Sequence, residues 1–208
     1  MTIPAFGRRK RLRHEKETMN PIVVPEFLFH YYENAAGPFS NLSMLPLEQA
    51  EQVMDEIRRN GNRFASQRSS DYLKKRFEVE NQIRKLFEEK GGQPRLARPH
   101  YMILGSCPWV KAWYVDGREL QIKLDSFPID CLSFTYGDSF PAMNYKDGKP
   151  YRGQVYNRNE LTEIIKQYGL PQEWNPDGKG GPERYIEAQV WDIAPLKELF
   201  RPLQINIS

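Results

Sequence analysis

A period-two pattern near the C-terminal end is the feature that most limits how this 208-residue chain can fold. The stretch 183–191 follows a Gly/Pro-rich break at 177–182. One side of an extended chain there carries three aliphatic residues, Ile186, Ala188 and Val190. The other side carries two aromatic and two polar residues, Tyr185, Glu187, Gln189 and Trp191. The pattern predicts a strand with one core face and one chemically equipped face, although an edge strand with its polar face in water gives the same alternation.

Length and composition fit one globular domain behind a basic tail. A chain of 208 residues with 39% hydrophobic and 27% charged residues can bury one ordinary core. Residues 1–20 are polar and lack periodicity, so they are predicted to be a disordered tail in front of a single domain, 21–208. No apolar run approaches the ~20 residues of a membrane span, and no apolar stretch follows the basic N-terminus as in a signal peptide. We therefore expect a cytoplasmic protein without a membrane partner.

The basic residues of the tail are the main charge asymmetry of the chain. The net charge is only +3, but one short run holds six basic side chains: Arg8, Arg9, Lys10, Arg11, Arg13 and His14. Such a run attracts phosphate backbones. Nucleic acid is therefore an expected partner, and a solvated tail without a partner is the alternative.

Helical spacing dominates the first half of the domain. Residues 22–32 first read as a Pro-interrupted, aromatic-rich strand. Apolar residues at helical spacing then predict a helix over 46–60, closed by Gly61, and a second helix over 69–90. The charged face of the second helix is interpreted mainly as a solvated surface.

From residue 99 onward the pattern becomes that of strands. Apolar or alternating stretches predict strands at 100–104, 110–115 and 120–124, and the Asp-Gly pair at 116–117 predicts that they form an antiparallel meander. A further strand is predicted within 129–139, where small hydroxyl residues alternate with aromatic ones.

A short strand near 154–156 and two short helices complete the domain. Asn157 and Glu160 have capping-box spacing and predict a helix that stops at Gly169, and residues 194–200 predict a last helical segment. Because each helix has one apolar face and the later strands alternate, the sequence predicts an α+β fold. We expect flanking helices on a mainly antiparallel β-sheet that is split around a cleft.

Common catalytic motifs are not found in the sequence. It contains no P-loop, GxGxxG, HExxH or GxSxG pattern, so the sites that these motifs build are not indicated. Asp125, Asp130 and Asp138 lie in turns, where aspartate is expected for structural reasons, and a metal site is the less favoured interpretation. Cys107 and Cys131 lack the spacing of a zinc site and are predicted to be buried thiols in a reducing cytoplasm.

Three separated strands carry distinctive polar residues: Phe29-His30-Tyr31, Ser133-Phe134-Thr135-Tyr136 and Tyr185-Ile186-Glu187-Ala188-Gln189. Their order resembles the ADP-ribosyltransferase superfamily, in which a His or Arg on the first strand, a Ser, Thr or Tyr on a central strand and a Glu on a late strand line one NAD cleft. The resemblance covers about residues 27–192 and looks most like DarT-type and related bacterial toxins, many of which modify nucleic acids. It implies an ADP-ribosyltransferase-like fold and NAD as co-substrate, with RNA, single-stranded DNA or a protein as acceptor. It also implies a toxin or antiviral defence role and an antitoxin partner.

The resemblance assigns the chemistry to the late strand. Breaking the bond between ribose and nicotinamide creates an oxocarbenium-like centre, which a carboxylate beside the ribose stabilises. Glu187 would have this catalytic role. Gln189, two residues along on the same face, would contact the acceptor or the nicotinamide amide.

The resemblance also implies which residues hold NAD. His30 would hydrogen-bond the adenosine-side ribose, and Tyr31 or Tyr136 would stack on the nicotinamide ring. Ser133 and Thr135 would line the pocket or hold the catalytic carboxylate. The pyrophosphate would meet one of three arginines, Arg68, Arg76 or Arg98.

Two other functions fit the same sequence. A metal-independent ribonuclease would use His30 and His100 as acid and base and would act without NAD. A module without enzymatic activity would bind nucleic acid or a protein. Its exposed aromatic residues would be the stacking platforms, namely Trp109, Trp113 and Trp191. Release of nicotinamide from NAD distinguishes the transferase from both.

Overall fold

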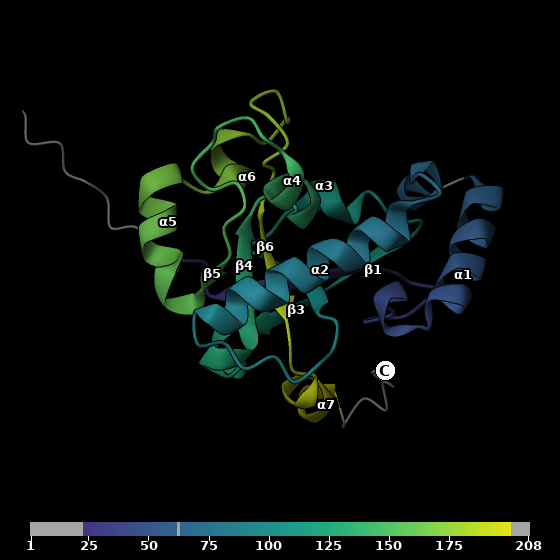
Figure 1. The fold of residues 1–208 in the computed structure, drawn as a ribbon, viewed down its shortest axis with the longest axis horizontal. Helices are drawn as coiled ribbons and strands as arrows, with labels where there is room; N and C mark the ends of the chain where they lie inside the picture. The colour runs from purple at the N-terminus through teal and green to yellow at the C-terminus, as the bar shows by residue number, and fades with distance from the viewer. Residues whose placement is uncertain (1–22, 62, 201–208) are drawn as a thin grey trace, which may run out of the picture.

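A computed structural model of the chain describes residues 23–61 and 63–200, which form an α+β fold on one six-stranded sheet (Figure 1). The strands are β1 (Phe27–Glu33), β2 (His100–Leu104), β3 (Gly117–Lys123), β4 (Leu132–Tyr136), β5 (Tyr156–Asn157) and β6 (Ile186–Val190). Their order in the sheet is β3-β1-β2-β6-β4-β5, and each pair of neighbours is antiparallel. The predicted α+β class with an antiparallel sheet is confirmed. The predicted tail, residues 1–20, lies outside the described residues.

Seven α-helical segments surround the sheet in the described part of the chain. They are α1 (Leu47–Asn60), α2 (Tyr72–Glu89), α3 (Pro108–Lys111), α4 (Ser139–Asn144), α5 (Leu161–Tyr168), α6 (Pro171–Trp174) and α7 (Ala194–Phe200). Short 3-10 turns lie at Leu42–Met44, Phe64–Gln67, Leu124–Ser126, Ile129–Cys131 and Arg158–Glu160. The predicted caps are confirmed where α1 ends at the left-handed Gly61 and where Asn157 and Glu160 form a capping box. Within the described residues, no helix is long and apolar enough to cross a membrane.

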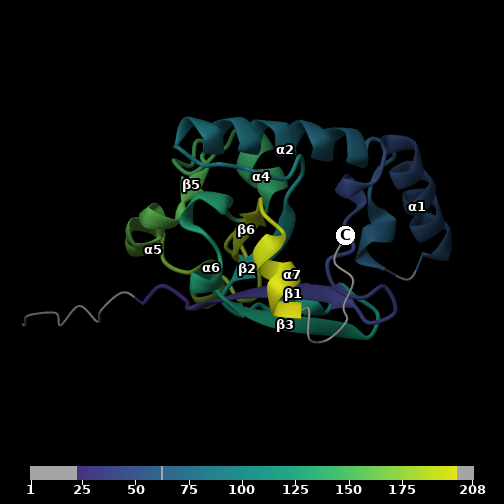
Figure 2. The same cartoon turned by 90° about the horizontal axis from the view of Figure 1, so that it is seen from below.

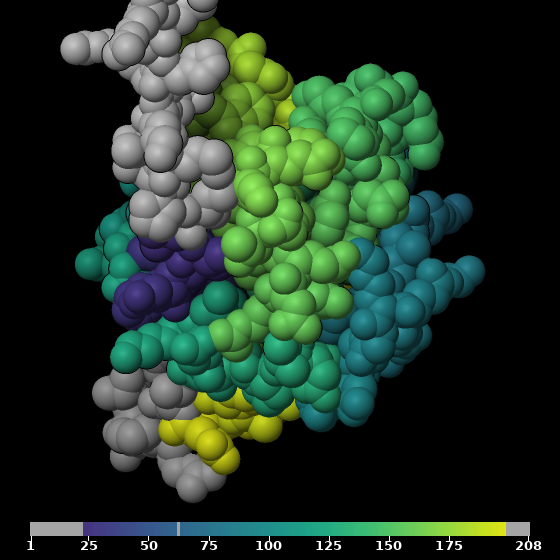
Figure 3. All heavy atoms as spheres, turned by 90° about the vertical axis from the view of Figure 1, so that its left-hand side faces the viewer, coloured from purple at the N-terminus to yellow at the C-terminus, as the bar shows by residue number. Residues whose placement is uncertain are grey.

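The sheet lies between two unequal helical layers. Its main core face packs aliphatic and aromatic strand residues against α5 and α7, through Leu161, Ile164, Ile165 and Leu196. Figure 3 shows this end of the molecule, where the green surface around α5 lies between the start of β1 and α2. The long helix α2 covers the other face, as Figure 2 shows, and packs Val79, Ile83 and Phe87 against α4 and Trp191. Residues on either face of a central strand are therefore shielded from water.

Strand β6 is a central strand. It pairs with β2 on one side and with β4 on the other, and all five of its residues are buried. Ile186, Ala188 and Val190 belong to the main core, as the alternation predicts. The alternative of an edge strand with a solvated polar face is wrong, because β6 lies between two strands, Gln189 is fully buried and Glu187 is only 8% exposed.

The predicted meander of three strands is wrong. Residues 108–111 form α3, with Pro108 at its first turn, and only the segment after Asp116 is extended. The resulting strand β3 pairs along its whole length with β1, and β2 pairs with β1 and β6. A short apolar run such as 110–115 fits a helix as well as a strand, and strand partners distant in sequence leave no local signal.

Strands β1 and β2 separate soon after they meet. They pair only at Leu28 with Leu104 and at Phe29 with Ile103, whereas β1 continues along β3 to Glu33. Beyond the last pair, Nδ1 of His30 lies 3.2 Å from the carbonyl of Tyr101 and bridges the gap with its side chain. The strands thus belong to one hydrogen-bonded sheet rather than to two separate ones, and the opening between β1 and β2 provides space for a ligand.

Candidate functional site

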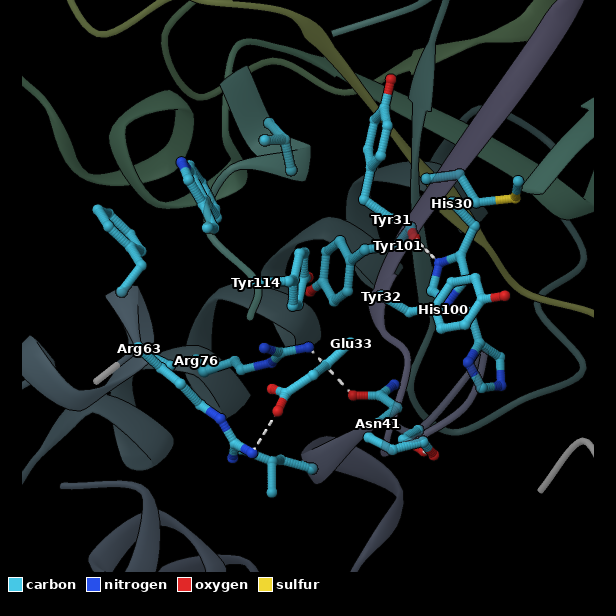
Figure 4. A pocket seen from close by; sticks show the side chains of 18 of the residues that line it. His30, Tyr31, Tyr32, Glu33, Asn41, Arg63, Arg76, His100, Tyr101 and Tyr114 are labelled. Atoms are coloured by element: carbon cyan, nitrogen blue, oxygen red, sulfur yellow. Dashed lines mark hydrogen bonds and ion pairs between the residues drawn. The ribbon is translucent and has the colours of Figure 1, made fainter. Parts of the chain in front are cut away.

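A cavity of about 710 Å³ occupies this opening. Its wall comes from β1, the loop 34–45, α1, the segment 63–76, β2, residues 113–114, the start of α4 and the start of β6. Figure 4 shows Arg76, Tyr101 and Tyr114 together in the cavity, with Arg63 joined to Glu33 nearby. Cavities of this size bind drug-sized or cofactor-sized molecules. The wall combines aromatic rings, arginines and carboxylates, so it suits a ligand that carries both a positive and a negative group.

Glu187 presents its carboxylate to this cavity from β6. The residue is 8% exposed, and its Oε2 accepts hydrogen bonds from the backbone amide of Ser139 at 3.0 Å and from the side chain of Gln189 at 3.4 Å. The side chain of Ser139 also hydrogen-bonds to the Glu187 carboxylate, so one residue holds this group through both its backbone and its hydroxyl. Burial, and then the negative charge of Asp138, raise the pKa of Glu187 to about 8. The carboxyl group is therefore protonated at neutral pH when no ligand offsets this cost.

A chain of buried hydrogen bonds stands behind Glu187. The indole nitrogen of Trp191 donates to Ser133 Oγ at 2.8 Å, and Ser133 Oγ donates to Gln189 Oε1 at 2.8 Å. Gln189 Nε2 then donates to Thr135 Oγ1 at 3.1 Å. Each of these side chains is shielded from solvent, and Ser133, Thr135 and Gln189 do not line the cavity. The predicted contact of Gln189 with an acceptor is corrected, because Gln189 orients Glu187 from behind.

Arg76 is the most firmly held cation of the cavity. Its Nε donates to Glu80 Oε1 at 3.0 Å, and its two terminal nitrogens donate to the Tyr72 hydroxyl and Asn41 Oδ1, both at 3.1 Å. Its guanidinium also lies 4.7 Å from the centre of the Tyr101 ring. Glu80 is fully buried, so Arg76 has one fixed orientation at the cavity wall.

Two further arginines line the cavity and one predicted arginine does not. Arg63 forms an ion pair with Glu33 at 2.6 Å. Arg68 lies 4.2 Å above the ring of Tyr72 and, among the described residues, forms no ion pair. Arg98 instead donates to Phe77 O and Asn81, away from the cavity. Among the described residues, Arg68 is therefore the cavity arginine whose charge no carboxylate offsets at ion-pair distance.

His30 lines the cavity but uses both ring nitrogens inside the protein. Nδ1–H donates to the carbonyl of Tyr101, and Nε2 accepts from the backbone amide of Phe39 at 2.9 Å. Burial lowers the pKa of His30 to about 4, so the ring is neutral. The Phe39 ring stacks on it at 4.3 Å, with the Phe39 backbone at a positive φ of 62°. His30 thus holds the loop 34–45 in place, and a neutral, doubly engaged ring does not favour a ribonuclease that uses His30 with His100.

The structure separates the two tyrosines predicted to stack on nicotinamide. Tyr31 lines the cavity, where its hydroxyl accepts from the backbone amide of Cys107 at 2.7 Å. Tyr136 lies on the opposite face of the sheet, where its hydroxyl donates to Tyr168 O at 2.7 Å and accepts from the Trp174 indole at 3.0 Å. The placement of Tyr136 at the cavity is therefore corrected. Its alternation with Thr135 already predicts the opposite face.

Several cavity residues were not predicted from the sequence: Asn41, Arg63, Tyr101, Tyr114, Asp138 and Ser139. The hydrogen bond from the Tyr185 hydroxyl to Asp138 was not predicted either. Most come from loops or from strands paired over long sequence distances, so no local pattern marks them. Asp138 had a signal, because an Asp directly after a strand and before a short helix predicts an N-cap, and it does accept from the amide of Phe140 at 2.8 Å.

The tryptophans do not form one exposed platform. Trp191 is fully buried, so its predicted exposure is wrong. Trp113 lines the cavity and stacks on Phe64 with ring centres 4.4 Å apart. Trp109 is 37% exposed, with the guanidinium of Arg184 4.1 Å from its ring centre.

The described residues contain no group of three or more His, Cys, Asp or Glu side chains that could hold a metal ion. Cys107 and Cys131 are buried free thiols, as predicted. Comparison of the chain with protein-family models, with curated proteins and with solved structures found no match.

Proposed function

We propose that this protein is an NAD-dependent ADP-ribosyltransferase with an ADP-ribosyltransferase-like fold. The observation that supports it best is Glu187, a buried carboxylate on a central strand that faces a cavity with aromatic rings and arginines. NAD carries a cationic nicotinamide ring, a pyrophosphate and a second ribose with adenine. The carboxylate and the arginines of the cavity match the two kinds of charge in that molecule.

Glu187 would lie beside the ribose that is attacked. When the bond from C1′ to the nicotinamide nitrogen breaks, its electron pair goes to the ring and positive charge develops on the ribose. An ionised carboxylate stabilises that charge and accepts a hydrogen bond from the 2′-hydroxyl. Glu187 becomes ionised in this complex because the cationic ring lowers its pKa from about 8.

The arginines and tyrosines of the cavity would position the rest of NAD. Arg68, which has no carboxylate partner among the described residues, would bind the pyrophosphate, and Arg76 would support it. Tyr31 and Tyr101 offer ring faces or edges to nicotinamide. His30 would contact the adenosine-side ribose only if Nε2 releases the amide of Phe39, so NAD binding would move the loop 34–45.

We further propose a nucleic-acid acceptor, RNA or single-stranded DNA, in preference to a protein. On the resemblance to DarT-type toxins, we also propose a role as a toxin or antiviral defence factor, with an antitoxin as its partner. Trp109 with Arg184 above its ring is a place where an acceptor base could stack. The same pair supports the second candidate, a nucleic-acid-binding module without activity.

The test is NAD binding and nicotinamide release by the full chain, with and without RNA or single-stranded DNA. Calorimetry should show NAD binding, and release should be slow in water and faster with the acceptor. Glu187→Gln should keep NAD affinity within about tenfold and lower the rate about a hundredfold or more, since losing one such electrostatic contact costs about 3 kcal/mol.

The matched control is Glu163→Gln, whose side chain is 76% exposed on α5. Glu183, four residues before Glu187, is unsuitable as a control because it is fully buried and paired with Lys149 and Arg152. Absence of both NAD binding and NAD turnover would overturn the proposal. Oligonucleotide binding without nicotinamide release would favour the binding module.

A further inference from the structure

Glu187 and Asp138 are fixed side by side at the cavity by neighbouring backbone amides. The amide of Ser139, the residue directly after Asp138, donates to Glu187 Oε2 at 3.0 Å. Asp138 Oδ1 accepts from the amide of Phe140 at 2.8 Å, and Asp138 Oδ2 accepts from the Tyr185 hydroxyl at 3.0 Å. Both carboxylates line the cavity. They therefore form one rigid unit with two negative groups when both are ionised.

The surroundings compensate this charge poorly. The titratable groups that face Glu187 from the elements packed around it are Tyr101, Tyr114, Tyr185, Arg76 and Asp138. Arg76 is the one cation among them, and the fully buried Glu80 already forms an ion pair with it at 3.0 Å. Burial together with the charge of Asp138 raises the pKa of Glu187 to about 8. At neutral pH the pair therefore keeps one proton.

The geometry also fixes the Glu187 carboxylate beside aromatic rings of the cavity. Glu187 is more than nine-tenths buried and lines the cavity, and Ser139 holds its carboxylate there through both its backbone amide and its side chain. Tyr101 and Tyr114 line the same cavity and lie close enough to Glu187 for its charge to raise the pKa of each hydroxyl, and their aromatic rings provide surfaces for a flat ligand. Two fixed carboxylates beside aromatic rings at the wall of a cavity suit a flat, positively charged ligand.

We propose that Glu187 and Asp138 together form a subsite for a positively charged aromatic ring and discriminate against the neutral, reduced form of that ring. The inference rests on the proposed function for the identity of the ring, which is the oxidised nicotinamide of NAD. A pyridinium cation placed at the pair stabilises its second negative charge, so the shared proton leaves to solvent as the cation binds. The neutral dihydropyridine ring of NADH provides no such charge, and the proton stays.

The experiment is calorimetry of the full chain at pH 7 in two buffers of different ionisation enthalpy, with NAD, NADH, N-methylnicotinamide cation and neutral nicotinamide as probes. NAD and the N-methylated cation should each release close to one proton. NADH and nicotinamide should release none. NAD should bind at least tenfold more tightly than NADH, and this preference should grow between pH 6 and 8.

Asp138→Asn keeps the shape of the side chain and its acceptor for the Phe140 amide but removes the charge. Because Glu187 then ionises more readily without a ligand, proton release on binding NAD should fall by half or more and the preference over NADH should fall severalfold. Asp177→Asn, at an exposed aspartate paired with Lys179, should change neither value. If the Asp138 variant does not fold, the wild-type probes alone decide the matter.

Equal affinity and equal proton release for NAD and NADH would overturn the subsite. If the chain binds neither dinucleotide, the proposed function fails, but the two small probes still test the pair. Preference for the N-methylated cation with proton release then supports the subsite. No preference between the small probes overturns it.

Discussion

Oε1 of the buried Glu80 accepts a hydrogen bond from Nε of Arg76 at 3.0 Å, and this ion pair within α2 fixes Arg76 at the wall of the cavity. The same oxygen accepts from the Ser43 hydroxyl at 2.7 Å and from the Tyr101 hydroxyl at 3.0 Å. One carboxylate thus connects α2, β2 and the loop 34–45. Its position explains why Arg76 is held so rigidly although it lies on a largely charged helix.

Replacing Glu80 by Gln should destabilise the protein and weaken NAD binding together. Loss of one partner of a buried ion pair leaves Arg76 uncompensated and costs about 3 kcal/mol of the free energy of unfolding. Urea denaturation measures this cost. Glu88→Gln, on the same helix but 47% exposed and paired with Arg84, should change stability by about 0.5 kcal/mol or less. Equal effects of the two variants would show that Glu80 has no special role.

The buried Glu187 should make the folded state less stable as pH rises. Its pKa is about 8 in the folded protein against an ordinary value of 4.5, so between these values the folded chain holds more protons than the unfolded one. His30 acts in the opposite direction, because its pKa falls from 6.5 to about 4 and its contribution is lost as pH falls through that range. Between pH 6.5 and 8 the contribution of His30 fades, and comparison with a variant that lacks the Glu187 carboxyl removes what remains of it. There the melting temperature of the wild type should fall more steeply than that of Glu187→Gln, and parallel slopes would contradict the raised pKa.

Arg68 should matter for NAD binding and little for folding. Its substitution by Ala breaks no ion pair among the described residues but removes a charged donor at the cavity. A charged hydrogen bond contributes about 1.5–3 kcal/mol, so NAD affinity should fall by about tenfold or more, as measured by calorimetry. Arg118→Ala, at an exposed arginine of β3, is the control. An unchanged dissociation constant would remove Arg68 from the proposed pyrophosphate site.

Trp191 and Ser133 should contribute to stability in a coupled way, because they share one buried hydrogen bond. Trp191→Phe and Ser133→Ala each remove one end of a buried 2.8 Å hydrogen bond, and each leaves a polar group without its partner. We expect each single variant to cost about 1–3 kcal/mol, and the double variant to cost less than the sum by about 1 kcal/mol. Denaturation of the four proteins tests this, and strict additivity would mean that the two side chains act independently.

The basic run at residues 8–14 lies outside the described residues, and its role stays a prediction. If it holds an oligonucleotide, its deletion should weaken binding of RNA or single-stranded DNA and flatten the dependence of affinity on salt, because fewer phosphate contacts release fewer counterions. Titrations at several salt concentrations give the slope. An unchanged slope would assign the run to solubility.

Local sequence patterns determined much of the secondary structure and the identity of the reactive face. The alternation around Glu187, the Gly61 end of α1 and the capping box at Asn157 each depend on neighbours within a few residues, so they can be read from the chain alone. The same alternation placed Ile186, Ala188 and Val190 in the core.

Tertiary structure decided what those patterns become. The pairing of β6 between β2 and β4 turned its polar face into a buried one, the pairing of β3 with β1 replaced the predicted meander, and the divergence of β1 from β2 opened the cavity. It also moved Gln189 behind Glu187 and placed Asp138 beside that carboxylate. The physical reason is that strand pairing, burial and charge coupling join residues tens of positions apart, and a pattern with a period of two or of 3.6 residues contains no information about its distant partner.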